Sequence, residues 1–298
     1  MAVSAPSAFR FFPVRVARST RLSPSLVRIT FAGESLRDFD SGGRDQSFSL
    51  FLPHPGQELP VLPDVDGDGW FAAWRAMDPE VRAIMRSYTV REHRRSPRGP
   101  GPGPAGARDD GGSRDDGDEV DVDFALHGDL GPASRWARAA RPGDRTTLLG
   151  PAVRENKSIG FRLPQDADWV LLAADETALP AVAGILDWLP PTVPAHIWLE
   201  VPDTADRRAL PHHPGAKVNW LVHEGSPARR GELLTALREA PFPAGAPYAW
   251  LAGEAGAVRA MRRHLVRERG LDRARVQFSG YWRLGATEED LRREALAG

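Results

Sequence analysis

The hydrophobic pattern of this chain changes period near its middle, and this change constrains the fold more than any single motif. Apolar and polar residues alternate over 11–16 and 26–31, as in strands with one buried face. In contrast, 169–174 is a continuous apolar run, which is typical of a strand buried within a parallel sheet. We therefore expect two domains of different architecture, and 298 residues are enough for two cores.

Alternating segments recur through the first half and are separated by glycine- and proline-containing turns. Short strands at this spacing are typical of an antiparallel barrel or sandwich. A short helix is expected around 70–85, and residues 151–164 would connect the two domains. The strands expected in this half are 11–16, 26–31, 46–52, 86–91, 120–127 and 146–150.

Strands and helices alternate in the second half, which predicts an open parallel sheet with right-handed crossovers. Such sheets bind ligands beyond the carboxyl ends of their strands. Three of the expected ends carry polar or aromatic side chains, at 175–177, 253–254 and 281–283. The expected strands are 169–174, 196–201, 217–223, 248–252 and 275–281. The expected helices end at Trp188 or cover 229–239, 258–269 and 288–296.

Residues 96–119 differ in composition from everything around them. Seven glycines, four prolines, six acids and three arginines occur in this segment, without a large apolar side chain. Because it can bury little surface, we expect a disordered insertion. Gly101, Gly103 and Gly106 have the spacing of a dinucleotide-binding fingerprint, but that motif requires a strand before it and a helix after it. No phosphate-binding role is expected here.

Composition excludes several classes of site. There is no cysteine, so a disulfide, a thiolate metal site and a cysteine-ligated iron–sulfur cluster are excluded. The net charge of −1 gives no reason to expect nucleic acid as a partner. No uninterrupted apolar run is long enough for a transmembrane helix, and we see no secretory signal, so a cytoplasmic protein without membrane insertion is expected. The adjacent His212 and His213 lack a metal-ligand spacing, and no metal site is expected.

The hexapeptide at 86–91 combines an aromatic ring, hydroxyls and guanidinium groups on one expected strand. Tyr88 could stack on a flat ring, Thr89 could bond to its edge, and an arginine of the segment could hold a phosphate with two hydrogen bonds. The alternative is an ordinary half-exposed strand whose polar residues face water.

A second candidate follows the expected strand at 120–127. Pro132 lies just after Gly131, which is a signal for the start of a helix. The amides and positive end of such a helix attract a pyrophosphate. A simple strand-to-helix turn would give the same pattern.

Four segments, taken in order along the chain, resemble those of the siderophore-interacting proteins, the flavin-dependent ferric-siderophore reductases of the ferredoxin–NADP reductase superfamily. The segments are 86–91, 124–136, 175–180 and 281–285. This resemblance covers nearly the whole chain and departs from the family at 96–119, where a short turn is usual. It implies an antiparallel six-stranded FAD-binding β-barrel at 1–152. An open parallel Rossmann-like sheet for NAD(P)H, with a C-terminal helix, would follow at 165–298.

On the barrel side, the resemblance places Tyr88 against the isoalloxazine ring, Thr89 near its N5 edge and Arg86 on the phosphates. Gly131 to Ser134 and Trp136 would surround the pyrophosphate and adenosine. The FAD contacts implied in this domain are Arg86, Ser87, Tyr88, Thr89, His127, Gly128, Gly131, Pro132, Ala133, Ser134 and Trp136.

On the sheet side, the resemblance places Asp175, Thr177 and Ala178 between flavin and the nicotinamide donor. Gly253 and Glu254 resemble a second loop on the donor side. Trp282 and Arg283 follow the last strand, where this superfamily has residues over the flavin. An arginine-lined mouth would attract an anionic chelate, and the candidates for it are Arg259, Arg262, Arg263, His264 and Arg283. A solvated helix face would account for the same residues.

The implied function is reduction of a ferric siderophore by FAD, which releases iron as Fe(II). NADH or NADPH would reduce the FAD, with ferredoxin as another possible donor. Flavin carries this chemistry, so no catalytic side chain is required, and we find no convincing acid–base pair or nucleophile. Arg207 and Arg208 could hold a 2′-phosphate or could be loop surface.

Two other functions remain open from the sequence. The chain could be a general NAD(P)H–flavin or ferredoxin-linked oxidoreductase with a different electron acceptor. It could also be a non-catalytic protein that binds a ferric chelate without turnover.

Overall fold

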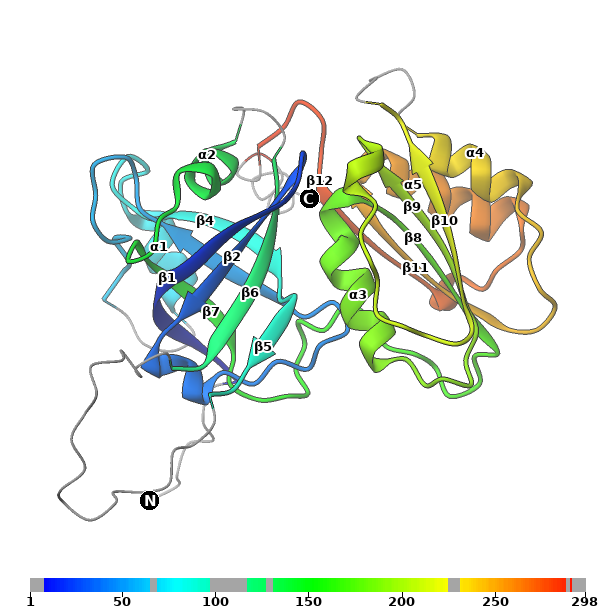
Figure 1. Cartoon of the computed structure of the whole chain (residues 1–298), viewed down its shortest axis with the longest axis horizontal. Helices are drawn as coiled ribbons and strands as arrows, with labels where there is room; N and C mark the ends of the chain where they lie inside the picture. Colours follow the sequence, from blue (N-terminus) through cyan, green and yellow to red (C-terminus); the bar gives the residue numbers. More distant parts are fainter. Residues whose placement is uncertain are drawn as a thin grey trace, which may run out of the picture.

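The computed structural model describes residues 8–64, 69–96, 117–126, 131–224, 231–287 and 290. In this part of the chain a curled antiparallel sheet and an open parallel sheet lie side by side (Figure 1). The expected insertion at 96–119, except for Ser96 and 117–119, lies outside the described residues. The same holds for the expected terminal helix at 288–296, except for Asp290.

The first body is a seven-stranded sheet in the order β4-β3-β7-β1-β2-β6-β5. All of its strand pairs are antiparallel. The strands are β1 (Phe9–Ser23), β2 (Leu26–Ala32), β3 (Ser47–Leu52), β4 (Ile84–Thr89), β5 (Glu92–Arg94), β6 (Glu119–Ala125) and β7 (Arg145–Pro151).

The chain connection between β4 and β5 curls this sheet into a barrel. These strands form opposite edges of the sheet, although only Val90 and Arg91 separate them in sequence. The Arg91 amide donates to the Asp121 carbonyl on β6 at 2.9 Å, and the Val90 amide donates to the Gln46 carbonyl at 2.9 Å. The barrel fold is confirmed. It has one strand more than the six expected, because three residues after the turn pair with β6 as β5.

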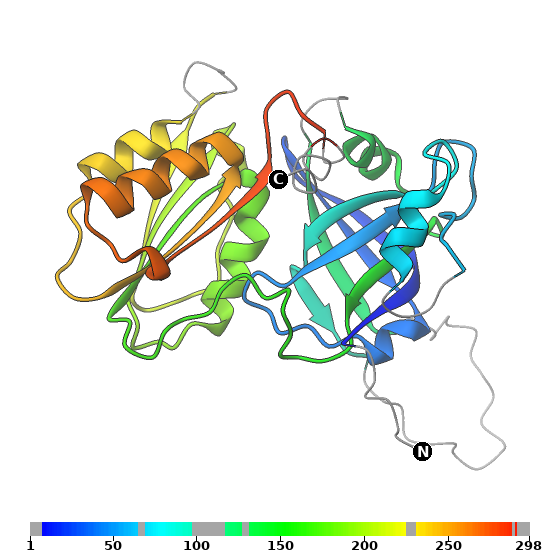
Figure 2. The ribbon, with the colours of Figure 1, turned by 180° about the vertical axis from the view of Figure 1, so that it is seen from behind.

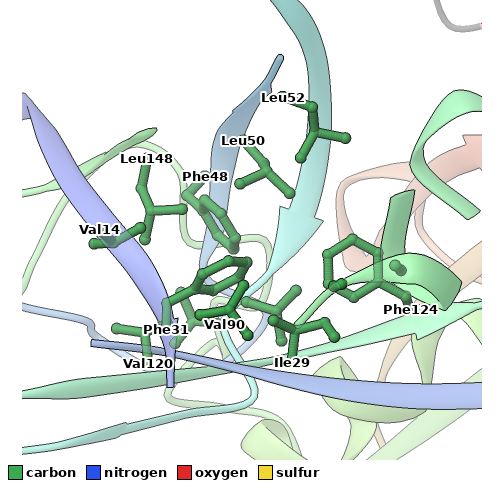
Figure 3. Packing of buried hydrophobic residues seen from close by; sticks show 14 of the residues in the cluster. Val14, Ile29, Phe31, Phe48, Leu50, Leu52, Val90, Val120, Phe124 and Leu148 are labelled. Carbon is green, nitrogen blue, oxygen red and sulfur yellow. The ribbon is translucent and has the colours of Figure 1, made fainter. Parts of the chain in front are cut away.

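Alternation along the strands fills the barrel interior. Phe12, Val14 and Val16 of β1 are buried, whereas the residues between them face outward. These side chains belong to one core with residues of the facing strands. Figure 3 shows Val14 in this core together with side chains such as Phe48 and Leu148. Burying a side chain of this size contributes about 2 kcal/mol relative to leaving it exposed. The alternating pattern therefore specifies which face of each strand is inside.

Short helices lie on the outside of the barrel. The helix α1 (Trp70–Ala76) covers a smaller apolar cluster that includes Phe51 and Trp74. The helix expected over 70–85 is too long, since Ile84 and Met85 belong to β4. The other helices here are α2 (Pro132–Ala139) and the 3₁₀ turn η1 (Glu34–Asp38).

The second body is a five-stranded parallel sheet in the order β10-β9-β8-β11-β12. Every residue of the central strand β8 is buried, as its continuous apolar pattern predicts. The strands are β8 (Trp169–Asp175), β9 (Ala195–Val201), β10 (Ala216–Val222), β11 (Pro247–Glu254) and β12 (Val276–Trp282).

Helices cover both faces of this sheet. One face packs against α3 (Leu179–Trp188) and shares its apolar core with Leu26 of the barrel. The other face packs against α4 (Glu232–Glu239) and α5 (Ala255–Arg263), which Figure 2 shows turned away from the barrel. A π-helical turn at His264–Glu268 continues α5. Among the described residues of this body, the 3₁₀ turns are η2 (Glu176–Ala178), η3 (Thr204–Asp206) and η6 (Arg273–Arg275).

The connection between the two bodies is bonded to the barrel. The amides of Gly160 and Phe161 donate to the carbonyls of Asp45 and Arg44 at 2.9 and 3.1 Å. On the opposite side of the junction, the Ser25 amide donates to Asp206 Oδ1 at 3.0 Å. Backbone hydrogen bonds therefore fix the connection to the barrel, and a backbone-to-side-chain hydrogen bond joins the two bodies in addition to their shared apolar surface.

Candidate functional site

Tyr88 and Thr89 lie next to each other on β4 and point in opposite directions, as successive residues of a strand do. The Tyr88 ring is half-buried against the barrel core, with its centroid 4.3 Å from that of Phe124. The Thr89 side chain is 6% exposed and bonds to residues at the junction with the parallel sheet. The strand thus connects an aromatic surface of the barrel with the contact between the two bodies.

The aromatic surface extends from β4 to α2. Phe124 lies between Tyr88 and Trp136, with the Phe124 and Trp136 centroids 6.1 Å apart. Trp136 is half-buried and packs on the barrel core. The two candidate segments identified from the sequence, 86–91 and 131–136, therefore meet at one part of the barrel.

The start of α2 has the properties expected of a phosphate-binding end. Gly131 is the N-cap residue with extended backbone, no side chain caps the helix there, and Pro132 occupies the first turn. The first amides of a helix lack intrahelical acceptors and can bind an anion. Ser134 and Ala133 are buried, and the Ser134 hydroxyl donates to the Ala125 carbonyl at 3.1 Å. These two side chains fix the helix on β6, which leaves their backbone as the part that can meet a ligand.

The remaining barrel residues of the expected site differ in exposure. Arg86 is half-buried, and its Nη1 donates to the Met85 carbonyl at 2.8 Å, while Ser87 is exposed. His127 and Gly128 lie outside the described residues.

Asp45 is a residue of this junction that the sequence did not reveal. Its side chain is 5% exposed and accepts hydrogen bonds from the Thr89 hydroxyl at 3.3 Å, from Trp250 Nε1 at 3.2 Å and from the Tyr281 hydroxyl. These donors come from β4, β11 and β12. Burial raises the pKa of Asp45 to about 7. One carboxyl thus joins the barrel to two strands of the parallel sheet.

The backbone at Asp45 is also unusual. Arg44 and Asp45 have φ values of 53° and 61°, in the left-handed region that side chains other than glycine seldom adopt. Asparagine and aspartate are the non-glycine residues that tolerate this region best. A lone acid before a strand carries no recognisable motif, so the sequence pattern does not single out Asp45.

Asp175 organises the carboxyl edge of the parallel sheet. Its Oδ1 accepts from the amide and hydroxyl of Thr177, and its Oδ2 accepts from the Glu254 amide and from Trp282 Nε1, both at 2.8 Å. Asp175, Glu254 and Trp282 are the last residues of three different strands, β8, β11 and β12. The structure therefore brings together the three strand ends that the sequence identified.

The individual roles expected on this edge differ. Thr177 is half-exposed, whereas Ala178 is fully buried in the core beneath α3, where its side chain supports packing. Glu254 caps α5, with its Oε2 accepting from the Ala257 amide at 2.8 Å. Gly253 has a φ of 137°, and a Cβ there would lie 2.4 Å from Asp175 Oδ2. Glycine is required at this position by both backbone and space.

The expected arginine-lined mouth is not assembled in this arrangement. Arg259, Arg262 and Arg263 lie on α5, which packs on the sheet face away from the barrel. Arg262 stacks over Phe278 at 4.5 Å, whereas Arg259 and Arg263 are exposed. Arg283, at the end of β12, is the one of these candidates that adjoins the strand end bonded to Asp175.

His264 does not fit a substrate-binding role. It is 4% exposed, and its Nδ1 lies 2.8 Å from Glu268 Oε2. Arg269 Nε donates to His264 Nε2 at 3.3 Å. The imidazole thus connects the π-helical turn to its own helix end, and burial keeps it from a chelate at the surface.

These features fit a ligand with a flat ring and a pyrophosphate. The half-buried Tyr88 offers a ring face, the α2 start offers backbone amides, and Thr89 offers a hydroxyl beside the junction.

Within the described residues, no three histidine, aspartate or glutamate side chains gather as metal ligands. In the same part of the chain, no helix has the length and apolar character needed to cross a membrane.

Two family models together cover most of the chain. Residues 15–155 match the siderophore-interacting FAD-binding domain, and residues 167–285 match the siderophore-interacting protein model. The first match covers the barrel with the Tyr88 surface and α2. The second begins just before β8 and ends after β12.

Several relatives are similar to this chain over nearly their full lengths. The NADPH-dependent ferric-chelate reductase of Escherichia coli is 30% identical over 279 residues, covering 92% of this chain and 93% of that protein. The ferric vibriobactin reductase ViuB of Vibrio cholerae is 29% identical over 274 residues, covering 91% and 89%. A siderophore utilization protein from T. fusca is 33% identical, with a TM-score of 0.73 over 94% of this chain and 95% of that structure.

More distant structures share the fold alone. A ferredoxin reductase of carbazole 1,9a-dioxygenase is 14% identical and has a TM-score of 0.55. The antiparallel barrel followed by a parallel sheet is therefore the architecture of ferredoxin reductases, as the sequence predicted. The two family matches and the full-length relatives show that the chain belongs to the siderophore-interacting protein family.

Proposed function

We propose that this protein is an FAD-dependent reductase of ferric siderophores that takes its electrons from NADH or NADPH. The observation that carries the proposal is the position of Tyr88 and Thr89 on one strand, between an aromatic barrel surface and the carboxyl edge of the parallel sheet. The match of the barrel to a siderophore-interacting FAD-binding domain supports it. The names of the relatives, a ferric vibriobactin reductase and a ferric-chelate reductase, support the same substrate class.

The residues of the barrel would bind and orient FAD. Tyr88 would cover one face of the isoalloxazine ring, and Thr89 would donate or accept a hydrogen bond at its edge. The amides at the start of α2 would hold the pyrophosphate, with Arg86 neutralising part of its charge. When bound, FAD supplies the redox chemistry, since it accepts a hydride and passes on single electrons. No acid–base side chain is needed for that step.

The carboxyl edge of the parallel sheet would bind the electron donor. Asp175 holds the ends of β8, β11 and β12 together, and Thr177 and Gly253 lie beside it. These fixed strand ends would position a nicotinamide ring against the flavin. Arg207 is exposed after β9, whereas Arg208 Nη1 donates to the Leu22 carbonyl at 2.6 Å. Arg207 is therefore the better candidate for contacting a 2′-phosphate.

Iron release would follow from reduction. Hard oxygen donors of a siderophore bind Fe(III) tightly, and reduction to the softer Fe(II) weakens that binding. Arg283 would attract an anionic chelate towards the junction. Arg259, Arg262 and Arg263 remain candidates for longer-range attraction from the outer face of the sheet.

An anaerobic assay tests this function. The purified protein should show a flavin absorbance band, lose it on addition of NADH or NADPH, and regain it when a ferric siderophore is added. A chromogenic ferrous chelator should then report Fe(II) in proportion to the nucleotide consumed. Activity only with reduced ferredoxin would show that ferredoxin, and not NADH or NADPH, is the electron donor. Activity with quinones but with no ferric chelate would favour a general flavin oxidoreductase. Tight binding of the ferric siderophore without reduction would indicate a non-catalytic binding protein.

A further inference from the structure

Asp45 occupies a buried position where three elements converge. Its carboxyl oxygens accept hydrogen bonds from Thr89 on β4, Trp250 on β11 and Tyr281 on β12. Thr89 Oγ1 also lies 3.4 Å from the Tyr281 hydroxyl. Thr89, Asp45 and Tyr281 therefore form one hydrogen-bonded group. Two of its members come from the barrel and one from the parallel sheet.

The surroundings of Asp45 supply hydrogen bonds but no compensating cation. In the described residues Asp45 forms no ion pair. The guanidinium of its neighbour Arg44 pairs with Glu155 and lies 4.9 Å from the Trp188 ring. The titratable groups that interact with it are Tyr281 on β12 and Tyr248 on β11, while Asp175 on β8 acts on Tyr281 and Arg162 in the connection acts on Tyr248. Burial raises the pKa values of both tyrosines, so they stay protonated at neutral pH.

Two backbone positions make room for this carboxyl. Asp45 has a left-handed φ of 61°, and the facing residue of the connection is Gly160. A Cβ on Gly160 would lie 2.0 Å from Asp45 Oδ2, so any other residue would displace the carboxyl. The left-handed backbone of Asp45, the glycine at position 160 and the donors from both bodies all fix this carboxyl in one place. A role in packing alone would not require a buried carboxyl there.

We propose that Asp45 is a positioning residue for the flavin edge, which sets the direction of the Thr89 hydroxyl through its own protonation state. As a carboxylate, Asp45 accepts the protons of both the Thr89 and the Tyr281 hydroxyls. As a neutral acid, it donates its proton to one of these hydroxyls, which must then direct its own proton elsewhere. The inference rests on the proposed function, in which Thr89 faces the flavin.

The consequence is a flavin environment that changes near neutral pH. Because the pKa of Asp45 is raised to about 7, both forms are populated there. The carboxylate places a negative charge close to the flavin edge, which disfavours the anionic reduced form of FAD. The midpoint potential of the bound FAD should therefore fall more steeply with pH in this range than it would without Asp45.

The Asp45→Asn variant isolates this effect. Asparagine has the same shape, tolerates the left-handed backbone and cannot ionise. We expect this variant to bind FAD and to lose the additional pH dependence of the potential within about one pH unit of 7. Glu200→Gln is the matched control, since Glu200 is another buried carboxyl with a raised pKa but does not contact the Thr89 group. It should keep the wild-type pH dependence.

Two further measurements do not depend on turnover. Infrared difference spectra of the FAD-free protein between acid and alkaline conditions should contain a carboxyl band that titrates near pH 7. This band should be absent from Asp45→Asn and present in Glu200→Gln. In addition, Gly160→Ala keeps the ionisable carboxyl of Asp45 but displaces it, and should alter the same pH dependence of the potential.

The outcomes separate this inference from the proposed function. Suppose that wild type and Asp45→Asn both bind FAD and reduce the ferric siderophore, and that their potentials depend equally on pH. This result would overturn the role of Asp45 and leave the proposed function intact. The absence of the infrared band from the wild type would do the same. A wild-type protein that cannot bind FAD would overturn the proposed function and, with it, any positioning of a flavin edge.

Discussion

Trp282 Nε1 donates to Asp175 Oδ2 at 2.8 Å and so ties the end of the last strand, β12, to the end of the central strand, β8. The same oxygen accepts from the Glu254 amide at the end of β11. One carboxylate thus fixes the relative positions of three strand ends. This is the edge at which parallel sheets bind nucleotides.

Removing the indole donor should weaken this edge. We expect Trp282→Phe to lower the free energy of unfolding by about 1 kcal/mol, the typical contribution of a single hydrogen bond. Chemical denaturation of the FAD-free protein measures it. Trp220→Phe is a suitable control because Trp220 is also half-buried, on β10, and packs against the sheet core. Equal losses in the two variants would show that the hydrogen bond to Asp175 contributes nothing.

Gly253 should resist substitution more than other glycines with positive φ. Gly253→Ala combines a φ of 137° with a Cβ 2.4 Å from Asp175 Oδ2. Gly270→Ala, at a φ of 73° with open space around it, meets only the backbone cost of about 1–2 kcal/mol. Thermal unfolding should therefore show a larger loss for Gly253→Ala. A loss no greater than that of Gly270→Ala would mean that Asp175 can move aside.

Tyr88 should contribute directly to cofactor affinity. We expect Tyr88→Ala to raise the dissociation constant of FAD about tenfold, corresponding to about 1.4 kcal/mol of lost stacking and burial. Fluorescence titration of the FAD-free protein measures this constant. Phe71→Ala removes an aromatic ring from the cluster around α1 and should leave FAD affinity unchanged. Wild-type affinity in Tyr88→Ala would remove this residue from the proposed site.

The position of Arg283 predicts a selective effect on an anionic substrate. Arg283→Gln should raise KM for an anionic ferric siderophore about fivefold, equivalent to about 1 kcal/mol of lost attraction, with kcat little changed. Arg263→Gln makes the same charge change on the exposed outer side of α5. It should have a much smaller effect. The opposite order would place the chelate on the outer face of the sheet.

Asp45 should make stability depend on pH in a defined direction. Since burial raises its pKa to about 7, the folded protein keeps a proton that the unfolded chain loses above about pH 4. The contribution of Asp45 to stability is therefore fully present below about pH 4, falls as pH rises, and reaches its minimum above about pH 7, a change of up to about 4 kcal/mol.

Denaturation of FAD-free wild type and Asp45→Asn across this range measures that contribution as the difference between them. The advantage of the wild type should shrink as pH increases. Asp187→Asn, which changes an exposed carboxyl that lies 3.4 Å from Arg91, controls for general charge effects. A difference between wild type and Asp45→Asn that is independent of pH would show that the carboxyl titrates alike in the folded and unfolded states.

Local patterns predicted the architecture because each depends on neighbouring residues. The alternation in β1 and the apolar run of β8 specify one buried face and two buried faces, and the structure confirms both. The end of α1 was missed although Pro79 marks it, since a proline inside a helix removes a hydrogen bond and ends the helix before it. The strand from Ile84 onwards then pairs with β3. Likewise, β5 exists only because β6 offers an edge for it to pair with.

In the candidate site too, residues that occur in short motifs could be predicted, whereas residues that only the fold brings together could not. Tyr88, Thr89 and the start of α2 were identifiable because their residue types occur together in short motifs. Asp45 was not, since its partner Tyr281 is 236 positions away in the chain. His264 illustrates the reverse error, because a histidine among arginines suggests an exposed basic face, whereas the π-helical turn buries it.

The most direct test of the central proposal is one anaerobic spectrum recorded in three steps. The protein as purified should show the absorbance of oxidised FAD, NADH or NADPH should bleach it, and a ferric siderophore should restore it with one equivalent of Fe(II) formed per electron transferred. A protein that is colourless and cannot be reconstituted with FAD would contradict the proposal. So would a flavoprotein whose bleached spectrum is unaffected by ferric siderophores.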